Sequence, residues 1–225
     1  MILITGASKG IGEFLFNKFK DEGYDVRGTY NSTCRNDNHL ERVDVSDFNS
    51  VTKWISSLEK DLSDVTLINC AAISDACFLH KSDPEMWSKI ISTNIIGSYN
   101  TIRQVLPIMR QQKWGRIINF SSVLAKLPTP GVSAYATSKA ALEGLTKTIA
   151  VENGALGITA NTISLGYAEI GMGINDVSEK HREKMLERIP VGRFCSPEEI
   201  YEAILFIIKN SYINGASIDL NGGIL

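Results

Sequence analysis

Short apolar runs alternate along the chain with longer segments of helical periodicity. The apolar runs predict buried strands, and the alternation with helices favours a parallel sheet that is covered on both faces. We therefore expect an α/β fold with a doubly wound, parallel, seven-stranded, Rossmann-like sheet, in a single domain over residues 1–225. The predicted strands are Ile2–Thr5, Tyr24–Tyr30, Val65–Asn69, Arg116–Phe120, Ile158–Ser164 and Ser217–Leu220, with a weaker one at Leu40–Val43.

Apolar stripes and capping residues predict the helices between these strands. Asp47, Asp83 and Ser196 are expected N-caps, and a proline follows each of the last two at the first helical position. In a doubly wound sheet, ligands bind beyond the carboxyl ends of the strands, so we expect the functional residues directly after the strands. The stripes are formed by Ile11, Phe14, Leu15 and Phe19, by Val51, Trp54, Ile55 and Leu58, and by Ile200, Ala203, Ile204 and Ile207.

A glycine-rich turn joins the first strand to the first helix, with the sequence Thr5-Gly6-Ala7-Ser8-Lys9-Gly10-Ile11-Gly12. Glycines at this place let the backbone approach a phosphate, and a helix N-terminus offers free N–H groups and the positive end of its dipole. The spacing differs from the GxGxxG fingerprint, and a plain glycine-capped turn would look the same. The strand before the turn and the helix after it favour a phosphate site.

A serine pair, a tyrosine and a lysine follow the fifth predicted strand. Ser121 and Ser122 come directly after it, Tyr135 lies thirteen residues beyond Ser122, and Lys139 lies four residues further. We expect a helix over Ala134–Glu152, which places Tyr135 and Lys139 on one face. The ordinary pKa of tyrosine is ~10, and a lysine ammonium one turn away would favour the phenolate. Taken alone, the same pair also fits an exposed helix surface.

Together and in this order, these motifs resemble those of the short-chain dehydrogenase/reductase family. The resemblance runs from Thr5 to Gly223 and includes the terminal Asn221-Gly222-Gly223. It is strongest with single-domain reductases related to 3-oxoacyl-acyl-carrier-protein reductase. It implies a nucleotide-binding oxidoreductase that transfers a hydride between NAD(P)(H) and a carbonyl or secondary alcohol.

The resemblance implies a role for each of four catalytic positions. Tyr135 would be the general acid/base, and Ser122 would hydrogen-bond and polarise the substrate carbonyl, while Ser121 would point elsewhere. Lys139 would tune Tyr135 and bind the nicotinamide ribose. Asn94 would hold a water in a proton relay, which is compatible with an asparagine at a helix bend.

The resemblance also implies the residues that bind the cofactor. Asp44 would contact the adenine, and Asn69 and Ala71 would border the adenosine ribose. The second strand ends without the acid that binds the ribose 2′-hydroxyl of NAD, and Lys9, helped by Arg35, could pair with a 2′-phosphate. NADP(H) is therefore favoured, with NAD(H) as the alternative. The expected cofactor-binding residues are Gly6, Ser8, Lys9, Gly10, Ile11, Gly12, Asn31, Asp44, Val45, Asn69, Ala71, Tyr135, Lys139 and Gly166.

Three segments depart from the family pattern. Asn69-Cys70-Ala71-Ala72 replaces Asn-Asn-Ala-Gly, Leu165-Gly166 replaces Pro-Gly, and Ile170 stands where a threonine would contact the cofactor. These departures motivate an alternative, a non-catalytic NADP-binding regulatory or scaffold protein. The intact serine, tyrosine, lysine and asparagine set argues against it. Residues 167–191 are expected to form the substrate lid, with a charged helical stretch over Glu179–Arg188.

Composition bears on partners and location. The net charge of −2, from 23 basic and 25 acidic side chains, indicates no nucleic acid or anionic membrane as partner. The four cysteines and three histidines lack metal-ligand spacing, so we expect no metal. No signal peptide is recognisable and no stretch approaches ~18 apolar residues, so we expect a cytoplasmic protein. The resemblance implies a homotetramer or homodimer that acts on a small-molecule or carrier-bound carbonyl substrate.

Overall fold

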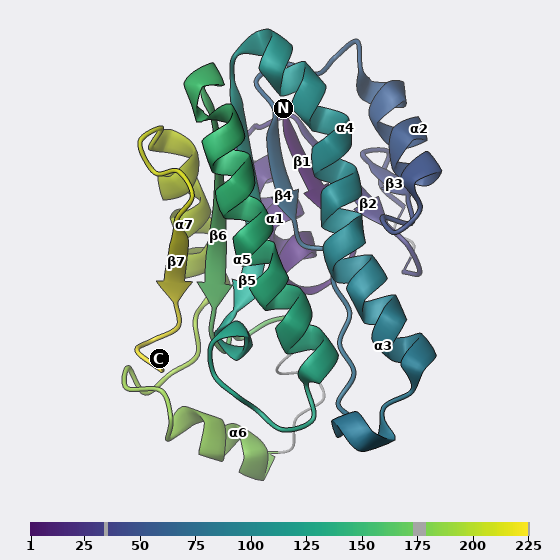
Figure 1. Ribbon diagram of the computed structural model, residues 1–225. Coiled ribbons are helices and arrows are strands. Elements are labelled where there is room, and N and C mark those ends of the chain that lie inside the picture. Colours follow the sequence, from purple (N-terminus) through teal and green to yellow (C-terminus); the bar gives the residue numbers. More distant parts are fainter. Residues whose placement is uncertain (34–35, 173–178, 225) are drawn as a thin grey trace.

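A parallel sheet of seven strands forms the centre of the protein (Figure 1). The computed structural model describes residues 1–33, 36–172 and 179–224. The strand order β3-β2-β1-β4-β5-β6-β7 confirms the expected doubly wound α/β fold, and it reverses direction between β1 and β4. The strands are β1 (Ile2–Thr5), β2 (Val26–Tyr30), β3 (Leu40–Arg42), β4 (Thr66–Asn69), β5 (Gly115–Ser122), β6 (Ile158–Leu165) and β7 (Ser217–Leu220).

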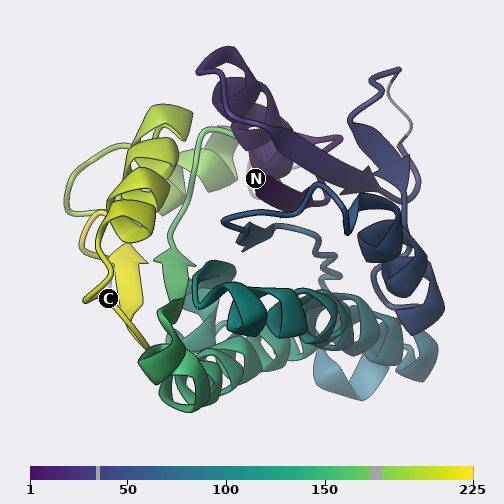
Figure 2. The ribbon, with the colours of Figure 1, turned by 90° about the horizontal axis from the view of Figure 1, so that it is seen from above.

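Helices cover both faces of the sheet, as Figure 2 shows from above. Helices α1 and α7 pack on one face through Phe16, Phe19 and Ile204, while α2, α4 and α5 pack on the other through Trp54 and Val105, among others. The helices are α1 (Gly10–Asp21), α2 (Phe48–Leu58), α3 (Pro84–Ile91), α4 (Gly97–Gln112), α5 (Ser133–Asn153), α6 (Glu179–Leu186) and α7 (Pro197–Lys209). Shorter turns are 3₁₀ at Leu79–Lys81, Val123–Ala125 and Gly154–Leu156, and π-helical at Ser92–Ile96.

The predicted helix caps are present. The carboxylates of Asp47 and Asp83 accept backbone N–H bonds in the first turns of α2 and α3. Ser196 and Glu199 form a reciprocal capping box at the start of α7. These side chains satisfy N–H groups that have no partner within the helix, which explains why the local sequence alone located these helix starts.

Six strand boundaries differ from the predicted ones, four of them by one residue and two by two residues. β2 begins at Val26 rather than Tyr24, because Tyr24 lies on the surface with its ring edge-on to Phe19. β5 continues past its predicted end through Ser121 and Ser122, which pair with the last residues of β6. The two serines therefore belong to the strand, not to the loop after it, and their positions are fixed by the sheet.

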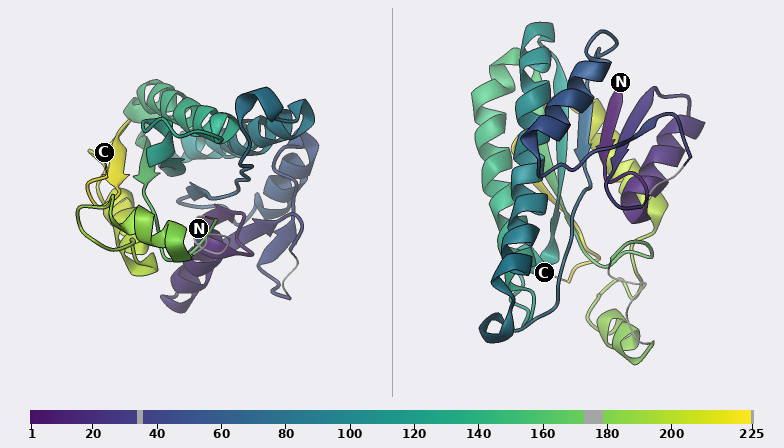
Figure 3. Two further views of the ribbon diagram at one scale, coloured as in Figure 1. Left: turned by 90° about the horizontal axis from the view of Figure 1, so that it is seen from below. Right: turned by 90° about the vertical axis from the view of Figure 1, so that its right-hand side faces the viewer.

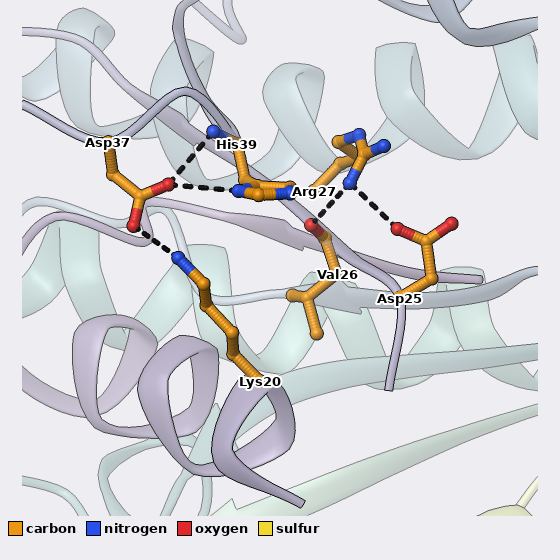
Figure 4. Close-up of polar contacts among 6 residues, drawn as sticks. All are labelled: Lys20, Asp25, Val26, Arg27, Asp37 and His39. Carbon is orange, nitrogen blue, oxygen red and sulfur yellow. Dashed lines mark hydrogen bonds and ion pairs between the residues drawn. The ribbon is translucent and has the colours of Figure 1, made fainter. Parts of the chain in front are cut away.

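The connection from β2, which ends at Tyr30, to β3, which begins at Leu40, is short. Two neighbouring parallel strands are usually joined by about a dozen residues or more. In its described part, Asp37 accepts hydrogen bonds from the Lys20 ammonium at 2.7 Å and from the His39 backbone N–H at 2.9 Å (Figure 4). These bonds lower the pKa of Asp37 to about 2 and fasten the connection to α1. Arg27, bonded to Asp25 at 2.7 Å, lies at the amino end of β2, away from the glycine turn.

The carboxyl ends of the strands lie at one end of the molecule, and α6 projects beyond them (Figures 1 and 3). The start of the expected lid is joined to the segment just after the lid, where the Cys195 N–H donates to the Tyr167 carbonyl and the Glu169 N–H donates to the Cys195 carbonyl, both at 2.9 Å. The predicted charged helix is present as α6. Residues 173–178 of the lid lie outside the described residues.

Candidate active site

The glycine turn between β1 and α1 packs tightly against the end of β4. Gly6 has a φ of +66°, and a Cβ there would lie 2.8 Å from the Cα of Ala71. A Cβ on Gly12 would lie 2.3 Å from the Gly6 carbonyl oxygen. The Thr5 hydroxyl accepts the N–H groups of Cys70 and Ala71, both at 3.1 Å, and so fixes the same junction. The turn therefore requires glycine at both positions, and it lies at the point where the strand order reverses.

The first turn of α1 has the features of an anion site. Lys9 is the N-cap residue, and its side chain makes no capping hydrogen bond to the helix N–H groups. Its side chain is exposed, whereas Ser8 is buried and Gly10 has a φ of +58°. Backbone N–H groups, the helix dipole and one lysine ammonium all favour a bound phosphate. These residues fit the phosphates of a dinucleotide.

Asp44 and Val45, expected near the adenine, follow β3 and are held against α4. The Asp44 carboxylate accepts the backbone N–H of Ser46 at 2.9 Å and its hydroxyl at 2.6 Å. The Val45 carbonyl accepts the Asn100 amide at 2.9 Å. A Cβ on Gly97 would lie 2.6 Å from the Val45 side chain, so this glycine allows the close packing. These contacts hold the segment against α4.

Two more of the expected cofactor residues, Asn31 and Gly166, directly follow other strands. Asn31 directly follows β2 and is exposed, whereas Arg35 lies outside the described residues. Gly166 directly follows β6, and its N–H donates to the Leu220 carbonyl at 2.9 Å. A Cβ on Gly166 would lie 2.8 Å from the Cα of Asn221. The glycine therefore lets the chain pass closely over the segment that follows β7.

The Asn69 side chain lies inside the protein, where it joins β4, β5 and α4. Its amide donates to Asn119 at 2.8 Å, and its oxygen accepts the Thr101 hydroxyl at 2.8 Å. Asn119 in turn donates to Thr146 of α5 at 2.8 Å. The predicted contact of Asn69 with the adenosine ribose would therefore have to come from its backbone.

Asn94 lies buried in the π-helical turn between α3 and α4, a kind of turn that is frequent at functional sites. Its side chain bonds both the N–H and the carbonyl of Ile73, at 2.9 and 3.0 Å. It also donates to the Ser138 hydroxyl at 2.9 Å, and Ser138 donates to the Tyr135 carbonyl at 2.7 Å. Asn94 thus connects the segment after β4 to the helix that carries Tyr135. Sequence reasoning missed Ser138, whose i+3 spacing from Tyr135 was the available signal.

Ser122, Tyr135 and Lys139 come together at the carboxyl end of β5. The Ser122 hydroxyl shares a hydrogen bond with the Tyr135 phenol and accepts the Leu124 N–H at 3.2 Å. The Lys139 ammonium donates to the Phe120 carbonyl at 2.7 Å and lies over the Tyr135 ring, 5.4 Å from its centroid. The arrangement places a hydroxyl donor, a phenol and a cation around one position at the sheet edge.

Burial decides the protonation of these groups. It raises the pKa of Tyr135 to about 12, against the opposite influence of the Ser122 hydrogen bond. It lowers the pKa of Lys139 to about 8, while the neighbouring Cys70 thiol acts in the other direction. The sequence argument expected Lys139 to lower the pKa of Tyr135. In the structure burial raises the pKa of Tyr135 instead, and the ammonium bonds the Phe120 carbonyl and lies over the ring.

Two structural features are absent from the described residues. None of the helices in residues 1–33, 36–172 and 179–224 combines the length and apolar character that crossing a membrane requires. The same ranges contain no cluster of three or more histidine, cysteine, aspartate or glutamate side chains that could hold a metal ion.

Comparison with known proteins agrees with this geometry. A family model described as enoyl-(acyl carrier protein) reductase matches residues 6–225. An acetoacetyl-CoA reductase of Rhizobium meliloti is 35% identical over 98% of this chain and 96% of its own. The 3-oxoacyl-[acyl-carrier-protein] reductase FabG of Staphylococcus epidermidis is 32% identical over 98% and 97%.

A solved structure gives the same result. The crystal structure of a 3-oxoacyl-[acyl-carrier protein] reductase from Brucella melitensis superposes with a TM-score of 0.89, at 29% identity, over 99% of this chain and 90% of that one. The expectation of a nicotinamide cofactor, with NADP(H) favoured, agrees with these relationships. The chain belongs to the short-chain dehydrogenase/reductase family and is an oxidoreductase.

Proposed function

We propose that the protein is an NADPH-dependent reductase of 3-oxoacyl thioesters, which converts the 3-ketone into a secondary alcohol. The observation that carries the proposal is the meeting of Ser122, Tyr135 and Lys139 at the end of β5, on the sheet edge that also bears the glycine turn. The thioester class is supported by the names of the relatives, an acetoacetyl-CoA reductase and 3-oxoacyl-[acyl-carrier-protein] reductases. Both names describe a ketone on a thioester carrier.

The cofactor would lie along the sheet edge from β2 to β5. The glycine turn and the first turn of α1 would hold its pyrophosphate, because the free N–H groups and the dipole of the helix N-terminus favour an anion there. Lys9 would pair with the 2′-phosphate, and Lys139 would bind the nicotinamide ribose. When bound, the reduced nicotinamide supplies the hydride that adds to the substrate carbonyl carbon.

The side chains of this protein would supply the polarisation and the proton. The Ser122 hydroxyl donates to the substrate carbonyl oxygen and stabilises the negative charge that develops there. As the carbonyl π electrons move onto oxygen, the resulting alkoxide takes the proton of the Tyr135 phenol. A pKa of about 12 keeps this phenol protonated at neutral pH, so it is ready to act as an acid. The Lys139 ammonium then stabilises the tyrosinate.

The test is NADPH oxidation with acetoacetyl-CoA, followed by the loss of near-ultraviolet absorbance, for the wild type and Tyr135→Phe. We expect kcat to fall by about 10²- to 10⁴-fold while NADPH affinity, measured by fluorescence titration, is retained. Tyr212→Phe, at a side chain that is 101% exposed, is the matched control. Turnover that survives Tyr135→Phe would remove Tyr135 as the acid. Tight NADPH binding without turnover of any ketone would favour a regulatory or scaffold protein.

Cofactor choice is tested with Lys9→Gln. The substitution removes one cation from the N-cap of α1 and leaves the glycines in place. A hydrogen bond to a charged group contributes about 1.5–3 kcal/mol, so NADPH affinity should fall by about tenfold or more while NADH affinity stays the same. An equal loss of affinity for NADPH and NADH would show that Lys9 does not bind the 2′-phosphate.

A further inference from the structure

Glu143 presents a carboxylate to the sheet from α5, one helical turn beyond Lys139. This half-buried side chain accepts the Ser121 hydroxyl at 3.0 Å and the Ser217 hydroxyl at 3.2 Å, both on Oε1. The Ser121 hydroxyl also lies 3.2 Å from the Lys139 carbonyl. A carboxylate turned towards a sheet is unfavourable unless hydrogen bonds compensate its lost hydration. Here two hydroxyls, one from β5 and one from β7, provide them.

The Glu143–Ser121 hydrogen bond is one of several polar contacts between α5 and β5. Helices usually pack on sheets through apolar contacts, which tolerate sliding, whereas hydrogen bonds restrict both distance and angle. Contacts at three successive strand residues therefore fix the position of α5 along β5. They join Asn119 to Thr146, Phe120 to Lys139, and Ser121 to Glu143.

We infer that Glu143 is a positioning residue, which sets the register of α5 against β5 so that Tyr135 and Lys139 face Ser122. This inference rests on the proposed function, because it concerns the geometry of the same reaction. Glu143 holds Ser121, and Ser121 directly precedes Ser122 along β5. A misplacement of about 1 Å between catalytic groups lowers a rate by about 10²-fold. Loss of the Glu143 carboxylate therefore acts on kcat more than on substrate binding.

Two substitutions of Glu143 separate positioning from charge. Glu143→Gln keeps an oxygen that accepts both hydroxyls, whereas Glu143→Ala removes it. We expect Glu143→Ala to lower kcat for acetoacetyl-CoA by about 10- to 100-fold with little change in KM, and Glu143→Gln to restore activity to near the wild type. Glu152→Ala, an exposed carboxylate on the same helix, is the matched control. Ser121→Ala should match Glu143→Ala, and the double variant should add no further loss.

A second measurement needs no turnover. Competitive acetylation of the cofactor-free protein, read by mass spectrometry, compares buried Lys139 with exposed Lys147 on the same helix. Lys139 should be labelled several-fold faster in Glu143→Ala and Ser121→Ala than in the wild type or Glu143→Gln, while Lys147 labelling stays constant.

The outcomes of the two measurements can be told apart. A folded Glu143→Ala protein with wild-type kcat and wild-type Lys139 labelling would overturn the inference. If Glu143→Ala does not fold, the smaller change Ser121→Ala decides in the same way. A wild type without turnover would refute the proposed function, and the Lys139 labelling alone would then decide the role of Glu143.

Discussion

Replacing Lys139 by methionine should stabilise the protein while it abolishes turnover. The lysine is only 4% exposed, and burial lowers its pKa from 10.5 to about 8. One pH unit corresponds to about 1.4 kcal/mol, so keeping this ammonium charged at pH 7 costs the folded state about 3 kcal/mol relative to the unfolded chain. Methionine has a similar unbranched shape and no charge, so it avoids this cost.

Part of this gain is offset by the lost hydrogen bond. The Phe120 carbonyl accepts from the Lys139 ammonium at 2.7 Å, and a buried acceptor left without a donor costs about 1–3 kcal/mol. We therefore expect a net stabilisation of about 0–2 kcal/mol at pH 7. For a chain of 225 residues, 1 kcal/mol raises the midpoint of thermal unfolding by about 2–4 °C.

The pH dependence identifies the cause. Below about pH 8, Lys139 is charged in both the folded and unfolded states, and the full cost is present. Between about pH 8 and 10.5, the folded state releases the proton first, so wild-type stability rises relative to the variant and the difference shrinks. Urea unfolding of both proteins at several pH values measures this, with Lys147→Met on the exposed face of α5 as control. A variant less stable than the wild type at pH 7, or a difference independent of pH, would refute the reasoning.

Three other predictions follow from the site and the surface. The kcat/KM for NADPH should fall as the pH rises through about 8, because Lys139 of the free enzyme then loses its charge; a flat profile to about pH 10 would contradict this. Gly12→Ala should weaken NADPH binding by about tenfold or more, since its Cβ would lie 2.3 Å from the Gly6 carbonyl oxygen, whereas Gly144→Ala, with no atom within 4 Å, should not. Val151, 86% exposed on α5, should become part of an interface in the expected homodimer or homotetramer, so Val151→Arg should lower the mass measured by sedimentation.

Most of the fold could be predicted because strands that are buried on both faces of a parallel sheet form short apolar runs in the sequence. All residues of β1 and β4 are buried; β1 is apolar except for Thr5, and β4 has the apolar pair Leu67 and Ile68 at its centre. The end of β5 could not be found in this way, because Ser121 and Ser122 are polar and are held by pairing with β6. The apolar pattern Ile102–Ile108 is partly explained by core packing, since Ile102 and Val105 are buried inside the chain.

The sequence could predict which residues form the site, but not the direction in which each side chain points. The spacing of Tyr135 and Lys139 places both on one helix face, yet it does not show that the ammonium bonds the Phe120 carbonyl. Asn69 and Asn119 are equally polar in sequence, and only the packing of α4 and α5 shows that both are used inside the protein. Local pattern identifies candidate residues, and tertiary neighbours decide where each polar atom points.

Lys139 and Glu143, two of the α5 side chains near the end of β5, should affect stability in opposite ways. Lys139 is a buried cation, so the folded state is less stable for keeping it charged. Glu143 is a half-buried anion that accepts two hydroxyls, so removing it leaves Ser121 and Ser217 without that acceptor. Lys139→Met and Glu143→Ala should both lower kcat, but the first should raise the free energy of unfolding and the second should lower it. A loss of activity caused only by general loosening of α5 would lower stability in both.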